Sequence, residues 1–164
     1  SAMTVKLHTG RWVIVLSFLI AFLLGGVPLP DSLERFRPDW VAMVLIYWNM
    51  ALPHRVGIGI GWLVGLLMDV GRGGLLGQHA LAFAVVAYLT CQTYRRIRAA
   101  PPWQQAFSIL FFLSVEQVLV FWISGVIGYP PRDWWYLAPA VGGMVCWPLL
   151  FVILRDVRRH FQVS

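Results

Sequence analysis

The chain has 164 residues, of which 59% are hydrophobic and 12% are charged, and its formal net charge is +6. Soluble domains carry roughly 25% charged residues, and a helix that is apolar on every side must be buried in protein or in lipid. This composition, with 9 Trp and 10 Phe, excludes an ordinary soluble domain and indicates a membrane protein.

Charge clusters and breaks at Pro and Gly divide the chain into six apolar segments. Residues 1–3 resemble a cloning scar. The apolar run after Arg11 could mimic a signal peptide, but no small-residue cleavage site follows it, so we interpret it as a retained first span. We expect one all-α integral membrane domain, residues 1–164, that forms a bundle of six short transmembrane helices. The expected spans are residues 12–28, 39–52, 56–71, 75–94, 103–128 and 134–154.

Two of these segments, 39–52 and 56–71, are short for a bilayer. At about 1.5 Å per residue they reach about 21–24 Å, whereas the hydrocarbon core is about 30 Å thick. Protein must cover them in part, the bilayer must thin locally, or they must run into ordered termini. A single kinked span is the competing interpretation, but Arg55 would be costly at mid-bilayer and Pro53 disfavours helix at Leu52.

The distribution of Lys and Arg predicts the orientation. With the N-terminus inside, nine of the 13 basic residues fall on the inner side and four on the outer side, so the positive-inside rule places both chain ends in the cytoplasm. The inner set is Lys6, Arg11, Arg55, Arg95, Arg96, Arg98, Arg155, Arg158 and Arg159, and the outer set is Arg35, Arg37, Arg72 and Arg132. Because these residues cluster beside spans, anionic lipid is the expected partner of the positive charge, and nucleic acid is not.

Four residues of the third segment share one face of a helix, because they are spaced by four. They are Gly57, Gly61, Gly65 and Asp69. Small residues at this spacing let another helix approach closely. The face then either receives a partner's helix, or packs within this chain while Asp69 caps a helix or pairs with Arg72.

Polar residues inside the spans form a second group of candidates. Glu116 lies near the middle of the fifth segment, beside Gln117. A carboxylate at that depth must take up a proton or find a donor, which makes intramembrane acids functional candidates. The donor is expected from His79, Gln78, Asn49 or another chain, in a structural or a functional contact. His79 is either part of a proton path or a satisfied core histidine.

Basic residues of the inner turns are candidate cytoplasmic contacts. They are His54, Arg55, Arg95, Arg96 and Arg98. They serve either as a solvated turn and orientation signals, or as contact points for a cytoplasmic filament or enzyme.

Enzyme chemistry is not expected from this sequence. Cys91 and Cys146 lie inside expected spans without CxxC or Cys/His spacing, so we expect small apolar fillers and no disulfide. No nucleophile has a base at a motif spacing, and no set of His, Cys and carboxylates has metal-ligand spacing. We therefore expect no catalysis, no metal and no cofactor.

The order of several blocks resembles the MreD family, the rod-shape-determining membrane proteins of Gram-negative bacteria, over nearly the whole chain. The blocks are "GRWVIVLSFLIAFLL", "FRPDW", "YWNMALPHRVGIGIGWLVGLLMDVGRGGLLGQHAL", "WQQA" and "WP" before a basic tail. Within them, 53–55 match the family's inner turn, and Gly65 and Asp69 match its glycine-acid block. Arg72 departs from the small or polar residue expected there, which leaves a pairing with Asp69 open.

The resemblance implies a non-enzymatic scaffold subunit of the cell-elongation (rod) complex in the bacterial inner membrane. The implied partners are MreC, a single-span protein, with the polymerase RodA, its class B penicillin-binding transpeptidase and the MreB filament; a homo-oligomer is also open. The fold implied is similar to the S-components of energy-coupling-factor transporters. The alternative function is therefore a small-molecule-binding component of a vitamin-type transporter, which needs a pocket of about 300 Å³ or more with convergent polar groups.

Overall fold

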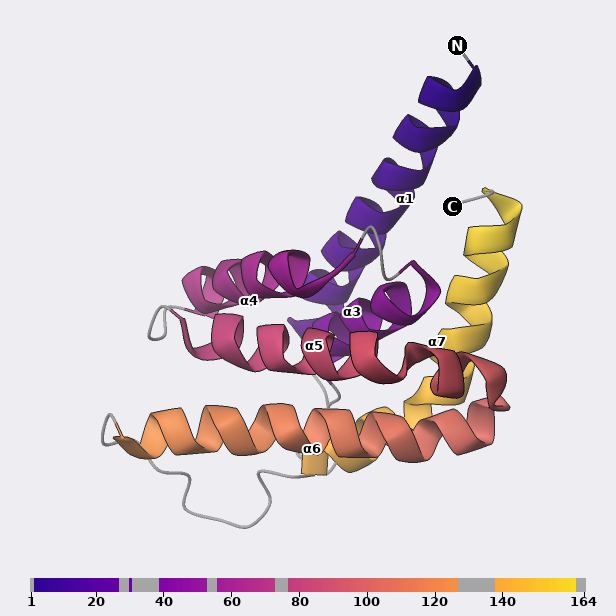
Figure 1. Ribbon diagram of the computed structural model, residues 1–164. Helices are drawn as coiled ribbons and strands as arrows, with labels where there is room; N and C mark the ends of the chain where they lie inside the picture. The colour runs from indigo at the N-terminus through magenta and orange to yellow at the C-terminus, as the bar shows by residue number, and fades with distance from the viewer. Residues whose placement is uncertain are drawn as a thin grey trace.

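The computed structural model describes residues 2–26, 30, 39–52, 56–72, 77–126 and 138–161, and within these ranges it is all-helical (Figure 1). The helices are α1 (Ala2–Gly25), α3 (Trp40–Ala51), α4 (Ile58–Arg72), α5 (Gln78–Ala99), α6 (Pro102–Val126) and α7 (Ala138–His160). Each expected apolar segment therefore contains one helix.

Helix α3 lies at the centre of the molecule. Every residue from Val41 to Ala51 is buried, and α1, α5, α6 and α7 all contact this helix. The Asp39 side chain accepts a hydrogen bond from the Ala42 N–H at 3.2 Å and caps its first turn. With 12 residues, α3 is about 18 Å long, too short to cross a bilayer by itself. Surrounding protein therefore covers this short helix on all sides.

The other helices stack around α3 in chain order. Helix α4 packs on α5, α5 on α6 and α6 on α7 (Figure 1). Helix α1 packs on α3, where the Trp48 indole N–H donates to the Ser17 hydroxyl at 2.9 Å. Both chain ends lie at the upper right of Figure 1, and the rings of Trp12 and Phe161 meet edge-to-face at 5.2 Å between centroids. The two chain ends therefore share one end of the molecule.

Several helices continue past the expected spans at this end of the molecule. Helix α1 begins at Ala2, ahead of the span 12–28, and α7 continues to His160, beyond the span 134–154. Arginines occupy the last turns of α5 and α7. Positive side chains there interact favourably with the negative end of the helix dipole and so stabilise the last turns of α5 and α7.

The outer surface is largely apolar. Large hydrophobic side chains are exposed along α1, α4, α6 and α7, among them Leu23, Val70 and Trp122. Contiguous exposed apolar surface of this kind marks contact with lipid or with a protein partner. In the described part of the chain, α6 (over 102–123) and α7 are long and apolar enough to cross a membrane, with mean hydropathies of 2.0 and 1.7.

Gln105 joins three helices at the α5–α6 turn. Its side chain is 1% exposed, and its amide Nε2 donates to the Ile97 and Ala100 carbonyls at 2.9 and 3.1 Å. Its Oε1 accepts from the indole N–H of Trp147 on α7 at 3.1 Å. One amide thus satisfies carbonyls at the end of α5 and a buried donor of α7.

Gln105→Leu should lower the free energy of unfolding by about 1–3 kcal/mol, because it leaves a buried indole N–H and two carbonyls without this partner. Thermal unfolding of the purified protein in a mild detergent measures the effect. Gln104→Leu is the matched control, because the neighbouring Gln104 is exposed. Equal melting temperatures for the two variants would contradict the bridging role of Gln105.

Candidate functional site

The glycine face of α4 is covered by α5 of the same chain. A Cβ atom added at Gly65 would meet the backbone of α5, with the Ala80 Cα at 2.6 Å and the His79 carbonyl oxygen closer still. A Cβ at Gly61 would lie 3.0 Å from the Ala87 Cβ and from the Phe83 carbonyl oxygen. The two backbones are therefore as close as glycine allows, and a partner's helix has no room on this face.

Gly57, the first glycine of the spaced set, lies just before α4. Its carbonyl accepts the N–H of Gly61 at 3.0 Å and so begins the helix.

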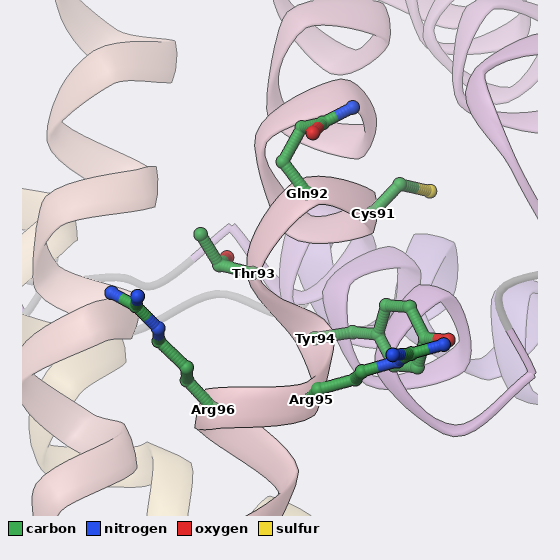
Figure 2. A pocket seen from close by; sticks show the side chains of 6 residues that line it. All are labelled: Cys91, Gln92, Thr93, Tyr94, Arg95 and Arg96. Atoms are coloured by element: carbon green, nitrogen blue, oxygen red, sulfur yellow. The ribbon is translucent and has the colours of Figure 1, made fainter.

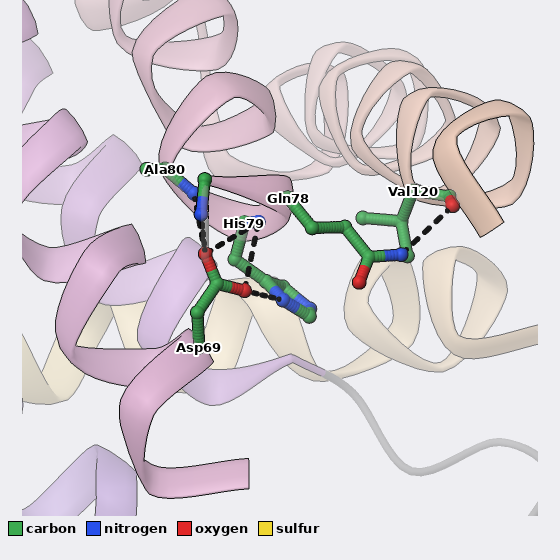
Figure 3. Close-up of polar contacts among 6 residues, drawn as sticks. Asp69, Gln78, His79, Ala80 and Val120 are labelled. Atoms are coloured by element: carbon green, nitrogen blue, oxygen red, sulfur yellow. Dashed lines mark hydrogen bonds and ion pairs between the residues drawn. The ribbon is translucent and has the colours of Figure 1, made fainter. Parts of the chain in front are cut away.

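Asp69 lies at the end of the same face and binds the beginning of α5 (Figure 3). The side chain is 1% exposed. Its carboxylate oxygens accept the N–H groups of Gly77 at 3.0 Å, His79 at 2.9 and 3.0 Å, and Ala80 at 3.3 Å. These are N–H groups that the helix itself cannot satisfy, at the positive end of its dipole. Asp69 therefore caps α5 from the neighbouring helix.

Gly77 explains why the cap comes from another helix. It occupies the N-cap position of α5 with φ at 102°, a backbone conformation that favours glycine, and makes no side-chain cap. Most helices are capped at this position by Ser, Thr, Asp or Asn. The side chain of Arg72, the other expected partner of Asp69, lies outside the described residues.

His79 and Gln78 leave the start of α5 in different directions (Figure 3). The His79 Nδ1 lies 2.8 Å from a carboxylate oxygen of Asp69, and its ring packs edge-on against Phe83 at 6.0 Å. The Gln78 Nε2 donates to the Val120 carbonyl on α6 at 3.0 Å. These two residues link the α4–α5 turn to both neighbouring helices, which is a structural use of both side chains.

Glu116 is fully buried in α6, one turn before Val120. Its Oε2 accepts from the Gln117 Nε2 at 3.4 Å, a long hydrogen bond. The side-chain amide of Asn49, another expected partner, donates to the Leu45 carbonyl at 3.0 Å. Gln78 reaches α6 at the carbonyl of Val120, four residues after Glu116.

The basic candidates lie at the opposite end of α5. Arg95 and Arg98 lie over the ring of Tyr94, and Arg96 is exposed. His54 and Arg55 lie outside the described residues.

A half-open hollow of about 360 Å³ adjoins this end, and its described lining is residues 91–96. None of the intramembrane polar candidates, residues 69, 78, 79, 116 and 117, borders it. In the described part of the chain no three His, Cys, Asp or Glu side chains gather as metal ligands.

Three residues with structural roles were not among the candidates from the sequence. Gln105 and Trp147 belong to the blocks "WQQA" and "WP", which carry the family resemblance. The two residues are 42 positions apart in the sequence, and a hydrogen bond joins them in the structure. Tyr94 precedes the arginines that it positions, and the string "YRRIR" was a usable signal.

Comparison with known proteins shows which family the chain belongs to. The family model described as rod shape-determining protein MreD matches residues 6–157. The rod shape-determining protein MreD of Haemophilus influenzae is 31% identical over 154 residues, which cover 93% of this chain and 95% of that protein. The chain belongs to the MreD family. This is a family of membrane proteins with a role in cell shape. No solved structure matches the chain, so the implied likeness to S-components stays a prediction.

Gly65→Ala should destabilise this MreD-family protein by about 1–3 kcal/mol, because the added methyl group meets backbone atoms that cannot move separately. Gly59→Ala is the control on the same helix, since nothing lies within 4 Å of its Cβ position. Thermal unfolding in detergent compares the two. The packing assignment fails if Gly65→Ala melts no lower than Gly59→Ala.

Asp69→Asn should cost about 1.5–3 kcal/mol, because an amide group turned toward N–H donors loses charge-assisted hydrogen bonds. Asp156→Asn is the control, because that carboxylate is 66% exposed and lies 3.8 Å from Arg155. Unfolding of both variants can be followed by circular dichroism. A loss for Asp69→Asn no larger than that for Asp156→Asn would show that the cap does not stabilise the fold.

Proposed function

We propose that this chain is a non-enzymatic membrane scaffold of the bacterial cell-elongation complex, which binds an MreC-like single-span protein and so helps to organise peptidoglycan synthesis. Membership of a shape-determining family supports the cellular role. The scaffold mechanism is supported by where the polar and the apolar side chains lie in the molecule. The described polar side chains at the α4–α5 turn serve packing within the chain, while the outward surfaces are apolar.

The proposed setting is the inner membrane, crossed six times, with both chain ends in the cytoplasm. The contact between Trp12 and Phe161 supports a common side for the two ends. Basic residues at the ends of α5 and α7 support the cytoplasmic assignment. Helix α3 is too short to cross a bilayer by itself, but this length is compatible with six spans because protein surrounds the helix.

The outward face of α4 is the proposed docking surface for the partner helix. Ile60, Leu63, Leu67 and Val70 recur at helical spacing and are exposed, opposite the face that packs on α5. Helix α4 has 15 residues and is about 22 Å long, so a bilayer must thin around its exposed side. A short span relieves this mismatch by associating with another helix. A longer helix of a single-span partner therefore fits this surface.

The remaining partners follow from the same arrangement. RodA and its class B penicillin-binding transpeptidase would join through membrane helices, and the MreB filament would approach the cytoplasmic end. The exposed Arg95 and Arg96 are at that end. The scaffold holds these partners in register, and they carry out the chemistry.

Site-specific photocrosslinking tests the docking surface. With a benzophenone amino acid at position 63 or 67, we expect a crosslink to the co-expressed MreC-like protein, identified by mass spectrometry. Position 107 on α6 is the control, because Phe107 is 64% exposed but belongs to another surface. Crosslinks to that partner from 107 and none from 63 or 67 would exclude the α4 face.

A further inference from the structure

The cytoplasmic end of α5 holds two arginines on one aromatic ring. The guanidinium carbon of Arg95 lies 5.8 Å from the centroid of the Tyr94 ring, and that of Arg98 lies 5.2 Å from it. The Arg95 Nε also donates to the Tyr94 hydroxyl at 3.3 Å. Cations over a ring face are attracted by its quadrupole, so Tyr94 holds both guanidiniums in a fixed place.

No carboxylate neutralises this pair among the residues that the structure describes, whose ion pairs are His79–Asp69 and Arg155–Asp156. The end of α7 offers an internal comparison. There Arg155 lies 5.8 Å above the Phe151 ring, but Asp156 is 3.8 Å away. Two positive groups on one ring repel each other, and a bound anion would offset that repulsion.

A hollow bordered by Tyr94 and Arg95 gives such an anion space. It measures about 360 Å³ and is lined by residues 91–96. Figure 2 shows that Tyr94 and Arg95 leave α5 on the same side as Cys91, whereas Arg96 points to the opposite side. Arg95 therefore leaves α5 on the side of Tyr94, the ring that Arg98 also contacts, whereas Arg96 borders the hollow from the opposite side.

The position of the pair points to a lipid headgroup as the anion. The arginines follow directly on the expected span 75–94, so they are expected at the level where that span leaves the hydrocarbon. Trp103, just across the α5–α6 turn, is 62% exposed, and Phe107 continues an exposed aromatic row one turn along α6. Exposed indoles are typical of the headgroup level, and basic pockets beside spans bind anionic headgroups.

We propose that Tyr94, Arg95 and Arg98 form a binding site for the phosphate of an anionic phospholipid headgroup. Both guanidiniums donate to the phosphate oxygens, Tyr94 fixes their spacing, and the acyl chains lie along the apolar surface of the adjoining helices. The site does not depend on the partner surface of α4, which lies on another helix.

Lipid-dependent stabilisation of the purified full chain in neutral detergent tests the site. Phosphatidylglycerol should raise the melting temperature at lower concentrations than phosphatidylcholine with the same acyl chains. High salt should remove the difference. With Arg95→Gln and Arg98→Gln combined, the half-saturating concentration of phosphatidylglycerol should rise about tenfold or more. The response to phosphatidylcholine should stay unchanged.

The charge-matched control combines Arg158→Gln and Arg159→Gln at the end of α7 and should keep the phosphatidylglycerol response. Equal losses in the two double variants would overturn the site in favour of diffuse attraction, as would equal responses to the two lipids. Glycerol phosphate that stabilises as well as the lipid would overturn the membrane source of the anion. A polyglutamate peptide that displaces phosphatidylglycerol with equal affinity would instead assign the site to an acidic protein segment.

A second variant covers the case in which the double substitution prevents folding. Tyr94→Leu keeps all charges and removes the ring, so it should weaken the preference for phosphatidylglycerol. Native mass spectrometry of wild-type protein gives an independent measure, with phosphatidylglycerol retained in preference to phosphatidylcholine. An undiminished preference in Tyr94→Leu, or no preference in the wild type, would contradict the proposal.

Discussion

The structure depends on the contact between the Asp69 carboxylate and the first N–H groups of α5. Gly65 makes this contact possible, because only a residue without a side chain lets the two backbones approach so closely. Asp69 is buried from water, and a buried N–H group left without a partner costs about 1–3 kcal/mol. One carboxylate therefore satisfies several donors at once and places negative charge at the positive end of the helix dipole. Helix α5, which this contact joins to α4, in turn packs on α3 and α6.

At the other end of α5, a side chain from a neighbouring helix again satisfies backbone groups of α5. There the carbonyls of Ile97 and Ala100 need donors, and the buried amide of Gln105 on α6 supplies them while it accepts from α7. Asp69 from α4 and Gln105 from α6 thus satisfy backbone groups at opposite ends of the same helix. Because each cap comes from a neighbour, the helices cannot separate without exposing backbone polar groups, and α3 stays covered between them.

The sequence predicts where each helix lies along the chain, but it does not predict which helices pack against each other. Apolar runs and breaks at Pro and Gly locate each helix, since few polar residues interrupt the runs. The sequence of α3 is apolar on every side, so it fits a lipid setting as well as the complete protein burial that the structure shows. A spacing of four places Gly61, Gly65 and Asp69 on one face, but the helix that covers this face depends on the turn that follows. Gln104 and Gln105 are adjacent and chemically identical, and only tertiary packing decides that Gln105 is the buried one.

Because the polar side chains at the α4–α5 contact bond within the chain, two surfaces are left for the proposed contacts: the apolar side of α4 and the basic end of α5. Different physical forces act at these two surfaces. The outward side of α4 is apolar and short, so the partner proposed for it would be selected through shape and hydrophobic length, which salt hardly affects. The arginines over Tyr94 carry fixed charge, and the attraction proposed between them and a lipid headgroup would weaken within about 10 Å at 0.1 M salt. A change in ionic strength should therefore act on the basic end of α5 and leave the α4 surface unaffected. On these two proposals, one small helical protein would contact a membrane helix through α4 and the charged membrane surface through the basic end of α5, each independently of the other.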